Sequence, residues 1–163
     1  SVHEYPTSEE MSQIAISTAR VVRLFGFEPK VAFVSHSTFG QPLTNRTKHI
    51  KKAVDILKDK SVDFEFDGDM QPDVALNDEY KSLYPFSKIV GNANILIMPG
   101  QHSAAISYKM MRELGGAKVI GPLLIGLGEP IEIAPLRSST SDILNLASVA
   151  AYSAGVINYK KKN

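Results

Sequence analysis

Two histidines and a group of carboxylates are the residues best suited to chemistry in this sequence of 163 residues. His36 and His102 each follow a short apolar run, and histidines in such places can act as acid–base groups or as ligands. Asp67, Asp69 and Asp73 could bind a cation, but their spacing lacks the remaining ligands of an EF-hand loop. Because no third ligand accompanies the histidines, we expect no metal site.

The aspartates belong to a segment that first alternates and then carries turn residues. Val62–Phe66 alternates polar and apolar residues, as a β-strand does, and Asp67-Gly68-Asp69 follows with residues typical of a turn. We therefore expect a strand region over 62–71 in which this acidic turn ends the strand. In open α/β sheets, ligands bind at the carboxyl ends of the strands.

A second loop offers hydroxyl groups instead of carboxylates. Ser35–Pro42 follows the apolar run 30–35 and precedes a predicted helix. Its hydroxyls, Ser37 and Thr38 among them, and its free N–H groups could hold a phosphate or a carbonyl oxygen, and a capped turn is the alternative. No P-loop, dinucleotide-binding or nucleophile-elbow motif is present in the sequence.

Two further candidates lie near the end of the sequence. Arg137 is a candidate ligand for an anion, because a guanidinium can donate two hydrogen bonds to a phosphate or a carboxylate. Asp142 lies in the first turn of a predicted helix, and capping of that helix is its alternative role.

Helices and strands alternate along the chain. Thr7 and Glu10 predict a capping box at the start of the first helix. The spacing of apolar residues predicts both the helices and the strands, and residues 72–86 are expected to be irregular or weakly helical. The expected helices are 8–25, 44–60, 103–114 and 141–157, and the expected strand regions are 30–35, 62–71, 95–98 and 118–127. This order predicts an α/β fold with a mostly parallel sheet, flanked by helices and joined by right-handed crossovers.

The composition excludes several classes of protein. A net charge of +1 implies no general affinity for nucleic acid or for an acidic membrane surface, and no apolar run approaches the roughly 20 residues that span a bilayer. The absence of cysteine removes disulfides and thiolate chemistry and fits a reducing compartment, so we expect a cytoplasmic protein. Ser1–Pro6 does not have the pattern of a signal peptide, and we expect the chain to be cut from a longer one.

Seven segments carry a resemblance to a known family: Val31–Gly40, Phe66–Leu76, Ala93–Pro99, Ile106–Lys109, Leu114–Ala117, Ile120–Leu127 and Ser141–Asn145. Together and in this order they resemble the phosphate acetyl/butyryltransferase family. The resemblance implies the isocitrate/isopropylmalate dehydrogenase-like fold of phosphotransacetylases, in which two α/β subdomains flank a cleft for coenzyme A and acyl phosphate. Residues 1–135 would form the inserted subdomain, and residues 136–163 would form the closing C-terminal helix of the other subdomain.

One departure from the family pattern concerns catalysis. Catalytic members read Asn-Asp-Leu-Ser-Arg-Gly and then an Asp, and the family pattern implies that this Asp acts as a base toward the thiol of coenzyme A. In this sequence Pro135 replaces the Ser, Leu136 replaces the Arg, and Asp142 matches the Asp. Neither Pro nor Leu can donate a side-chain hydrogen bond to a developing oxyanion, and losing one such donor typically costs about 10²–10³ in rate.

This departure resembles the C-terminal, phosphotransacetylase-like domain of large bacterial NADP-dependent malic enzymes. The resemblance implies a domain that is inactive in acyl transfer and that serves acetyl-CoA-responsive regulation and homo-oligomerisation. The parent enzyme would oxidatively decarboxylate malate to pyruvate, with NADP and a divalent metal bound to an N-terminal malic-enzyme domain and no cofactor in this one. The implied ligands of acyl-CoA or phosphate are Ser37, Thr38, Gly40, Asn94, Gln101, Arg137 and Asp142.

Two alternatives remain open on the sequence. The first is an active phosphate acetyltransferase, which converts acetyl-CoA and phosphate into acetyl phosphate and coenzyme A. In that enzyme Asp142 would deprotonate coenzyme A and Arg137 would hold the phosphate. The second is an assembly domain that binds no ligand.

Overall fold

The computed structural model describes residues 3–116 and 118–162. The chain divides into two compact units, Ser1–Lys109 and Met110–Asn163, which are described separately below. The expected division into residues 1–135 and 136–163 remains a prediction.

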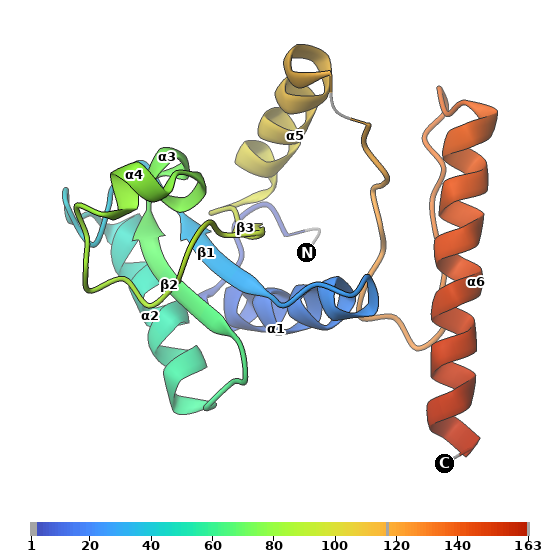
Figure 1. Ribbon diagram of the computed structural model, residues 1–163, viewed down its shortest axis with the longest axis horizontal. Coiled ribbons are helices and arrows are strands. Elements are labelled where there is room, and N and C mark those ends of the chain that lie inside the picture. Colours follow the sequence, from blue (N-terminus) through green and yellow to red (C-terminus); the bar gives the residue numbers. More distant parts are fainter. Residues whose placement is uncertain (1–2, 117, 163) are drawn as a thin grey trace. The chain divides into compact units, whose positions relative to one another are not determined.

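The first unit is built on a three-stranded parallel sheet with the strand order β2-β1-β3 (Figure 1). Its strands are β1 (Lys30–Val34), β2 (Glu65–Met70) and β3 (Ile95–Ile97). The central strand β1 is apolar, as expected for a strand buried on both faces, and Val31 and Phe33 are completely buried. The predicted α/β fold with a parallel sheet is confirmed.

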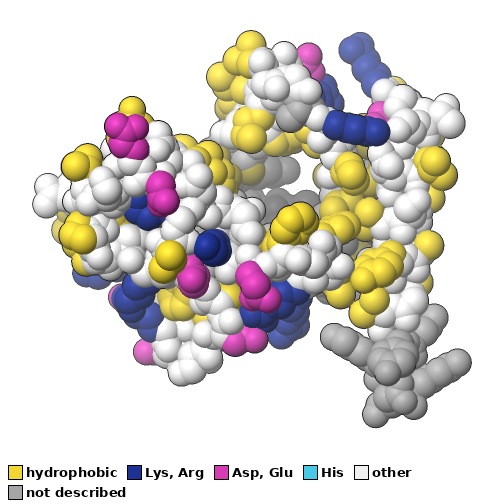
Figure 2. Space-filling view, viewed as in Figure 1, with side chains coloured by type: hydrophobic (Ala, Val, Ile, Leu, Met, Phe, Trp, Pro, Cys, Tyr) yellow, Lys and Arg dark blue, Asp and Glu magenta, His cyan; other side chains and the backbone are white. Residues whose placement is uncertain are grey.

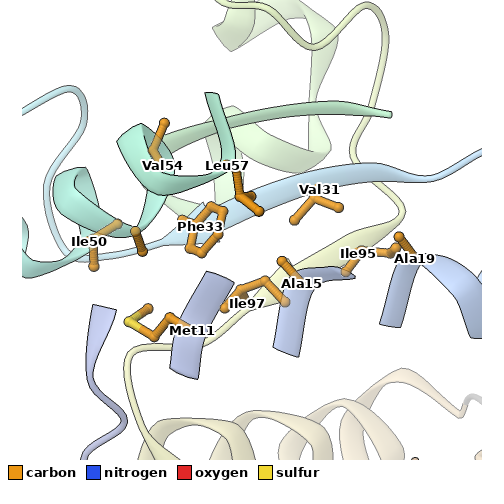
Figure 3. Packing of buried hydrophobic residues seen from close by; sticks show 11 residues of the cluster. Met11, Ala15, Ala19, Val31, Phe33, Ile50, Val54, Leu57, Ile95 and Ile97 are labelled. Atoms are coloured by element: carbon orange, nitrogen blue, oxygen red, sulfur yellow. The ribbon is translucent and has the colours of Figure 1, made fainter. Parts of the chain in front are cut away.

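Helices α1 (Ser8–Leu24) and α2 (Asn45–Asp59) cover one face of this sheet. The predicted capping box at Thr7 is confirmed: Thr7 Oγ1 accepts from Glu10 N at 3.2 Å, and Glu10 Oε2 accepts from Thr7 N at 2.8 Å. Figure 3 shows Phe33 between the apolar side chains of α2 and those of α1. This cluster fixes the two helices against the strands and so places the first turn of each helix near the carboxyl ends of the strands.

A less regular segment covers the opposite face of the sheet. Helices α3 (Pro72–Leu76) and α4 (Asp78–Lys81) lie in the stretch for which weak helicity was expected. A second cluster of buried side chains forms here, with Ala32 and Met70 from the strands and Ile89 from the segment that leads to β3.

The predicted turn at residues 67–69 is wrong, because β2 continues through it to Met70. Gly68 pairs with Phe33 of β1, and the register shifts by one residue immediately afterwards, so that Val34 pairs with Met70. A side chain at Gly68 would place its Cβ 2.7 Å from the Phe33 carbonyl oxygen and 2.8 Å from Phe33 Cβ. The glycine at position 68 therefore allows β2 to approach β1 closely and to form a bulge, and it does not form a turn.

The second unit contains the end of α5 (Gln101–Gly115), which begins in the first unit, and the helix α6 (Thr140–Lys162). Both helices were predicted within a few residues. The predicted strand region 118–127 is wrong: the described residues 118–139 include no strand. A strand forms only when its backbone groups find a partner strand, and none of the described strands pairs with this stretch. No described helix is long and apolar enough to cross a membrane.

Candidate functional site

The hydroxyl-rich loop follows β1 and is fastened to the end of β2 by Asp69. Ser37 Oγ donates a hydrogen bond to Asp69 Oδ2, and Gly40 N donates to Asp69 Oδ1 at 3.0 Å. The carbonyl oxygen of Asp69 also accepts from Phe39 N at 2.6 Å. Asp69 is only 2% exposed, so this buried residue organises the loop through two hydrogen bonds to its carboxylate and one to its backbone carbonyl oxygen.

Thr38 adds a further link in the same loop. Its hydroxyl oxygen accepts from Gln71 N at 3.2 Å, and its backbone pairs in both directions with Gln41 across a tight turn. Ser37 is completely buried and Thr38 is 5% exposed. The structure thus brings Ser37, Thr38 and Gly40 together as the sequence suggested, but Ser37 Oγ and Gly40 N already donate to Asp69, and Thr38 Oγ1 accepts from Gln71 N.

Asn94 lies at the opposite end of the sheet, just before β3. Its side-chain oxygen accepts from Lys30 N at 2.8 Å, and its side-chain nitrogen donates to the Glu28 carbonyl oxygen at 2.8 Å. The amide therefore joins the beginnings of β1 and β3, and the structure does not bring Asn94 near the hydroxyl loop.

Gln101 and His102 begin α5 after the end of β3, and both are exposed. Gln101 N donates to the Glu4 carbonyl oxygen at 3.3 Å, and His102 Nε2 lies 3.5 Å from Glu4 Oε1. His36 is also exposed, and its Nδ1 lies 3.5 Å from Ser35 Oγ. Among the described residues, no group of three or more histidines and carboxylates is arranged to hold a metal ion.

Asp142 and Arg137 lie in the second unit. Asp142 Oδ2 accepts from Ser139 N at 2.9 Å and from Ser139 Oγ at 2.7 Å, and Ser139 Oγ in turn accepts from Asp142 N at 3.2 Å. These hydrogen bonds, those of the Ser139 hydroxyl first, lower the pKa of Asp142 below its ordinary value. Arg137 is exposed, and none of the described ion pairs includes it.

Sequence reasoning missed the role of Asp69 in organising the hydroxyl loop. It treated Asp69 as a turn residue, and its partners Ser37 and Gly40 are about thirty positions away in sequence. One signal was available: a glycine inside an otherwise strand-like segment marks a bulge or a close backbone approach, and Gly68 stands directly before this carboxylate.

The family is decided by a sequence comparison that covers most of the chain. The sequence profile described as phosphate acetyl/butaryl transferase matches residues 1–151. The chain belongs to the phosphate acetyl/butyryltransferase family. This confirms the resemblance carried by the seven segments of the sequence.

Relatives of two kinds match this member of the phosphate acetyl/butyryltransferase family. An NADP-dependent malic enzyme of Rhizobium meliloti is 49% identical over 94% of the chain, which spans 20% of that enzyme. A phosphate acetyltransferase of Clostridium acetobutylicum is 37% identical over 94% of the chain, which spans 46% of that enzyme. The chain therefore spans about a fifth of these malic enzymes and about half of the Clostridium acetobutylicum phosphate acetyltransferase.

Solved structures support the same family. A phosphotransacetylase from Streptococcus pyogenes has a TM-score of 0.87 with 32% identity, over 94% of this chain and 47% of that chain. A phosphotransacetylase from Staphylococcus aureus has the same TM-score with 28% identity, over 94% of this chain and 48% of that one. The fold is therefore that of a part of a phosphotransacetylase.

Proposed function

We propose that the chain is a phosphotransacetylase-like domain of an NADP-dependent malic enzyme, itself inactive in acyl transfer. In this proposal acetyl-CoA or a related acyl-CoA binds the domain and regulates malate oxidation elsewhere in a cytoplasmic homo-oligomer. The observation that carries the proposal is the replacement of the family's hydrogen-bond donors by Pro135 and Leu136. The similarity to malic enzymes over nearly the whole chain supports the choice of parent protein.

The local structure supports the loss of acyl transfer at this segment. The Pro135 carbonyl oxygen accepts from Ser138 N at 2.9 Å in a turn, and the Leu136 side chain is fully exposed. Acyl transfer develops negative charge on the carbonyl oxygen under attack, and catalysis requires donors aimed at that oxygen. Neither side chain has a donor, so the electrostatic contribution of this segment would be lost.

Asp142 is also poorly suited to the role of base. Its hydrogen bonds from Ser139 stabilise the ionised carboxylate and lower its pKa, which makes the carboxylate a weaker acceptor for a thiol proton. Its observed role is to cap α6, because it receives the free N–H of Ser139. Arg137 remains available to an anionic ligand, since it is exposed and in no described ion pair.

Regulation requires that the effector bind two states of the parent protein with different affinities. An acyl-CoA that favours one state of a homo-oligomer would shift the equilibrium between the two states by at most the ratio of its affinities for them, and allosteric coupling typically changes an affinity by about 5–150-fold. NADP and the divalent metal would be held by the malic-enzyme domain, and no residue described here is assigned to them.

An active phosphate acetyltransferase is the second candidate, favoured by the 37% identity to such an enzyme and by the presence of Asp142 and Arg137. Two assays on the full-length protein separate the candidates. The first follows malate-dependent reduction of NADP with and without acetyl-CoA, and the second follows thioester formation from acetyl phosphate and coenzyme A. The regulatory proposal predicts a response in the first assay and none in the second, and the reverse pattern contradicts it.

A further inference from the structure

A pocket of about 270 Å³ lies in the first unit between the segment before α1, the first turns of α1 and α2, and the residue after Met98. Its lining residues are Tyr5, Pro6, Thr7, Met11, Asn45, Arg46, His49, Ile50 and Pro99. Four of them are apolar, and the others offer hydrogen-bond donors or acceptors. None of them belongs to the hydroxyl loop or to the residues that the sequence singled out as ligands.

The pocket lies at the carboxyl edge of the parallel sheet. Pro99 follows the end of β3, and Asn45 begins α2 after the loop that follows β1. Met11 and Ile50 are 2% and 1% exposed and lie at the same end of the hydrophobic cluster (Figure 3). This is the edge at which open α/β sheets bind ligands, and its apolar wall is held rigidly by the core.

The permanently charged side chain among the lining residues of this pocket is Arg46. The Arg46 guanidinium carbon lies 5.2 Å from the centre of the Tyr5 ring, which holds that side chain against the pocket wall. None of the described ion pairs includes Arg46 or His49. Arg46 thus keeps its N–H donors for another partner, and His49 can donate from a ring nitrogen.

The neighbouring carboxylates are already paired with other groups. Glu9 Oε1 lies 2.8 Å from Lys52 Nζ, and Glu10 accepts from Thr7 N and lies 2.7 Å from His3 Nδ1. Elsewhere on the first unit, Figure 2 shows acidic and basic side chains interspersed over the face that it draws. An anion entering the pocket would therefore meet the Arg46 guanidinium, which is in none of the described ion pairs, and the imidazole of His49.

We propose that this pocket binds the phosphate group of a small phosphorylated ligand, with Arg46 and His49 as its donors. The body of the ligand would lie against Tyr5, Met11 and Ile50. A volume of about 270 Å³ is near the lower limit of ligand pockets, so it suits one phosphate group with a short organic group or one end of a longer molecule. In the neighbouring hydroxyl loop, the donors Ser37 Oγ and Gly40 N are bonded to Asp69 and do not compete for this role.

The pocket does not depend on the regulatory function proposed above, and it is tested on the chain itself. Inorganic phosphate is titrated into isotopically labelled protein at constant ionic strength, balanced with chloride, while the amide resonances of Thr7, Arg46 and His49 are followed by NMR. We expect saturable shifts at these amides. Arg46→Gln and His49→Gln should each weaken phosphate binding by about tenfold or more, because each removes a charge-assisted hydrogen bond.

Lys48→Gln is the matched control. Lys48 lies between Arg46 and His49 in α2, is exposed, and does not line the pocket. Its removal takes one positive charge from the same turn and should change phosphate binding by less than about twofold. Both kinds of variant replace exposed side chains, and their amide spectra in the absence of phosphate report whether the fold is retained. Equal weakening by Lys48→Gln and Arg46→Gln, or no saturable shift in the unsubstituted protein, overturns the proposal.

Two further titrations identify the source of the phosphate group. Acetyl phosphate tests a small acyl phosphate, and the pair of coenzyme A and dephospho-coenzyme A tests the 3′-phosphate of the coenzyme. Shifts with acetyl phosphate assign the pocket to acyl phosphates. Shifts with coenzyme A that are lost with dephospho-coenzyme A assign it to the coenzyme. Shifts at these amides that saturate at the same ligand concentration when Arg46 is replaced contradict phosphate recognition by this pocket.

Discussion

Replacing Gly68 by alanine should destabilise the first unit far more than replacing a glycine that has room for a side chain. Gly68 has φ +147°, and a Cβ there would lie 2.7 Å from the Phe33 carbonyl oxygen and 2.8 Å from Phe33 Cβ. Backbone strain at such a φ costs about 1–3 kcal/mol, and overpacking against a buried strand costs about another 1–3 kcal/mol. Gly68→Ala should therefore lower the free energy of unfolding by about 2–6 kcal/mol.

Gly26→Ala is the matched control. Gly26 also has a positive φ, +83°, but nothing lies within 4 Å of the position that a Cβ would take. Only the backbone term applies there, so its cost should be about 1–2 kcal/mol. Urea unfolding of both variants, followed by circular dichroism, measures the difference. Equal losses of free energy in the two variants would refute the close approach of β2 to β1 at Phe33.

Three other predictions rest on single side chains. Ser37→Ala should lower the free energy of unfolding by about 1–3 kcal/mol in urea, because it removes the buried hydroxyl bonded to Asp69; an unchanged midpoint would contradict the role of Asp69. Ser139→Ala should raise the pKa of Asp142 in a carboxyl NMR titration, because it removes the hydroxyl that donates to the carboxylate. In the unsubstituted protein, the stability contributed by ionised Asp142 should be lost as pH falls from the ordinary aspartate pKa through the lowered one. Lys81→Met should increase the free energy of unfolding at pH 7 by about 1–3 kcal/mol, because the buried Lys81 ammonium has no described hydrogen-bond partner and lies 3.9 Å from Asp78 Oδ1 in a long ion pair. Burial lowers the pKa of Lys81, so the unsubstituted protein should gain stability between that pKa and the ordinary lysine value as pH rises, and the variant should not.

The helices of the first unit could be predicted because their signals are local. Thr7 and Glu10 are three residues apart, and the capping box that they form needs no contact from elsewhere in the chain. The apolar run of β1 likewise predicted a strand buried on both faces, since helices or loops must cover such a strand.

The errors arose where a distant partner decides the structure. Asp67-Gly68-Asp69 has the residues of a turn, but pairing with β1 extends the strand through it. Residues 118–127 have the residues of a strand, but none of the described strands pairs with them. In the first place a partner strand overrode the turn propensity, and in the second place the strand propensity found no described partner strand.

The candidate site was predicted in part. The position of Ser37, Thr38 and Gly40 after β1 followed from the order of elements. The hydrogen bonds from Ser37 and Gly40 to Asp69 depend on the bulge between β1 and β2. Asn94 could not be placed from the sequence, because its amide bonds depend on how β1 and β3 begin side by side.

The proposed loss of acyl transfer is tested most directly by the rate at which the full-length protein forms acetyl-CoA from acetyl phosphate and coenzyme A. A phosphate acetyltransferase of the same family, such as that of Clostridium acetobutylicum, provides the reference under identical conditions. With Pro135 and Leu136 in place of the family's donors, the rate should be lower by at least about 10²–10³-fold. A rate within about tenfold of the reference enzyme would contradict the proposal and establish an active acetyltransferase.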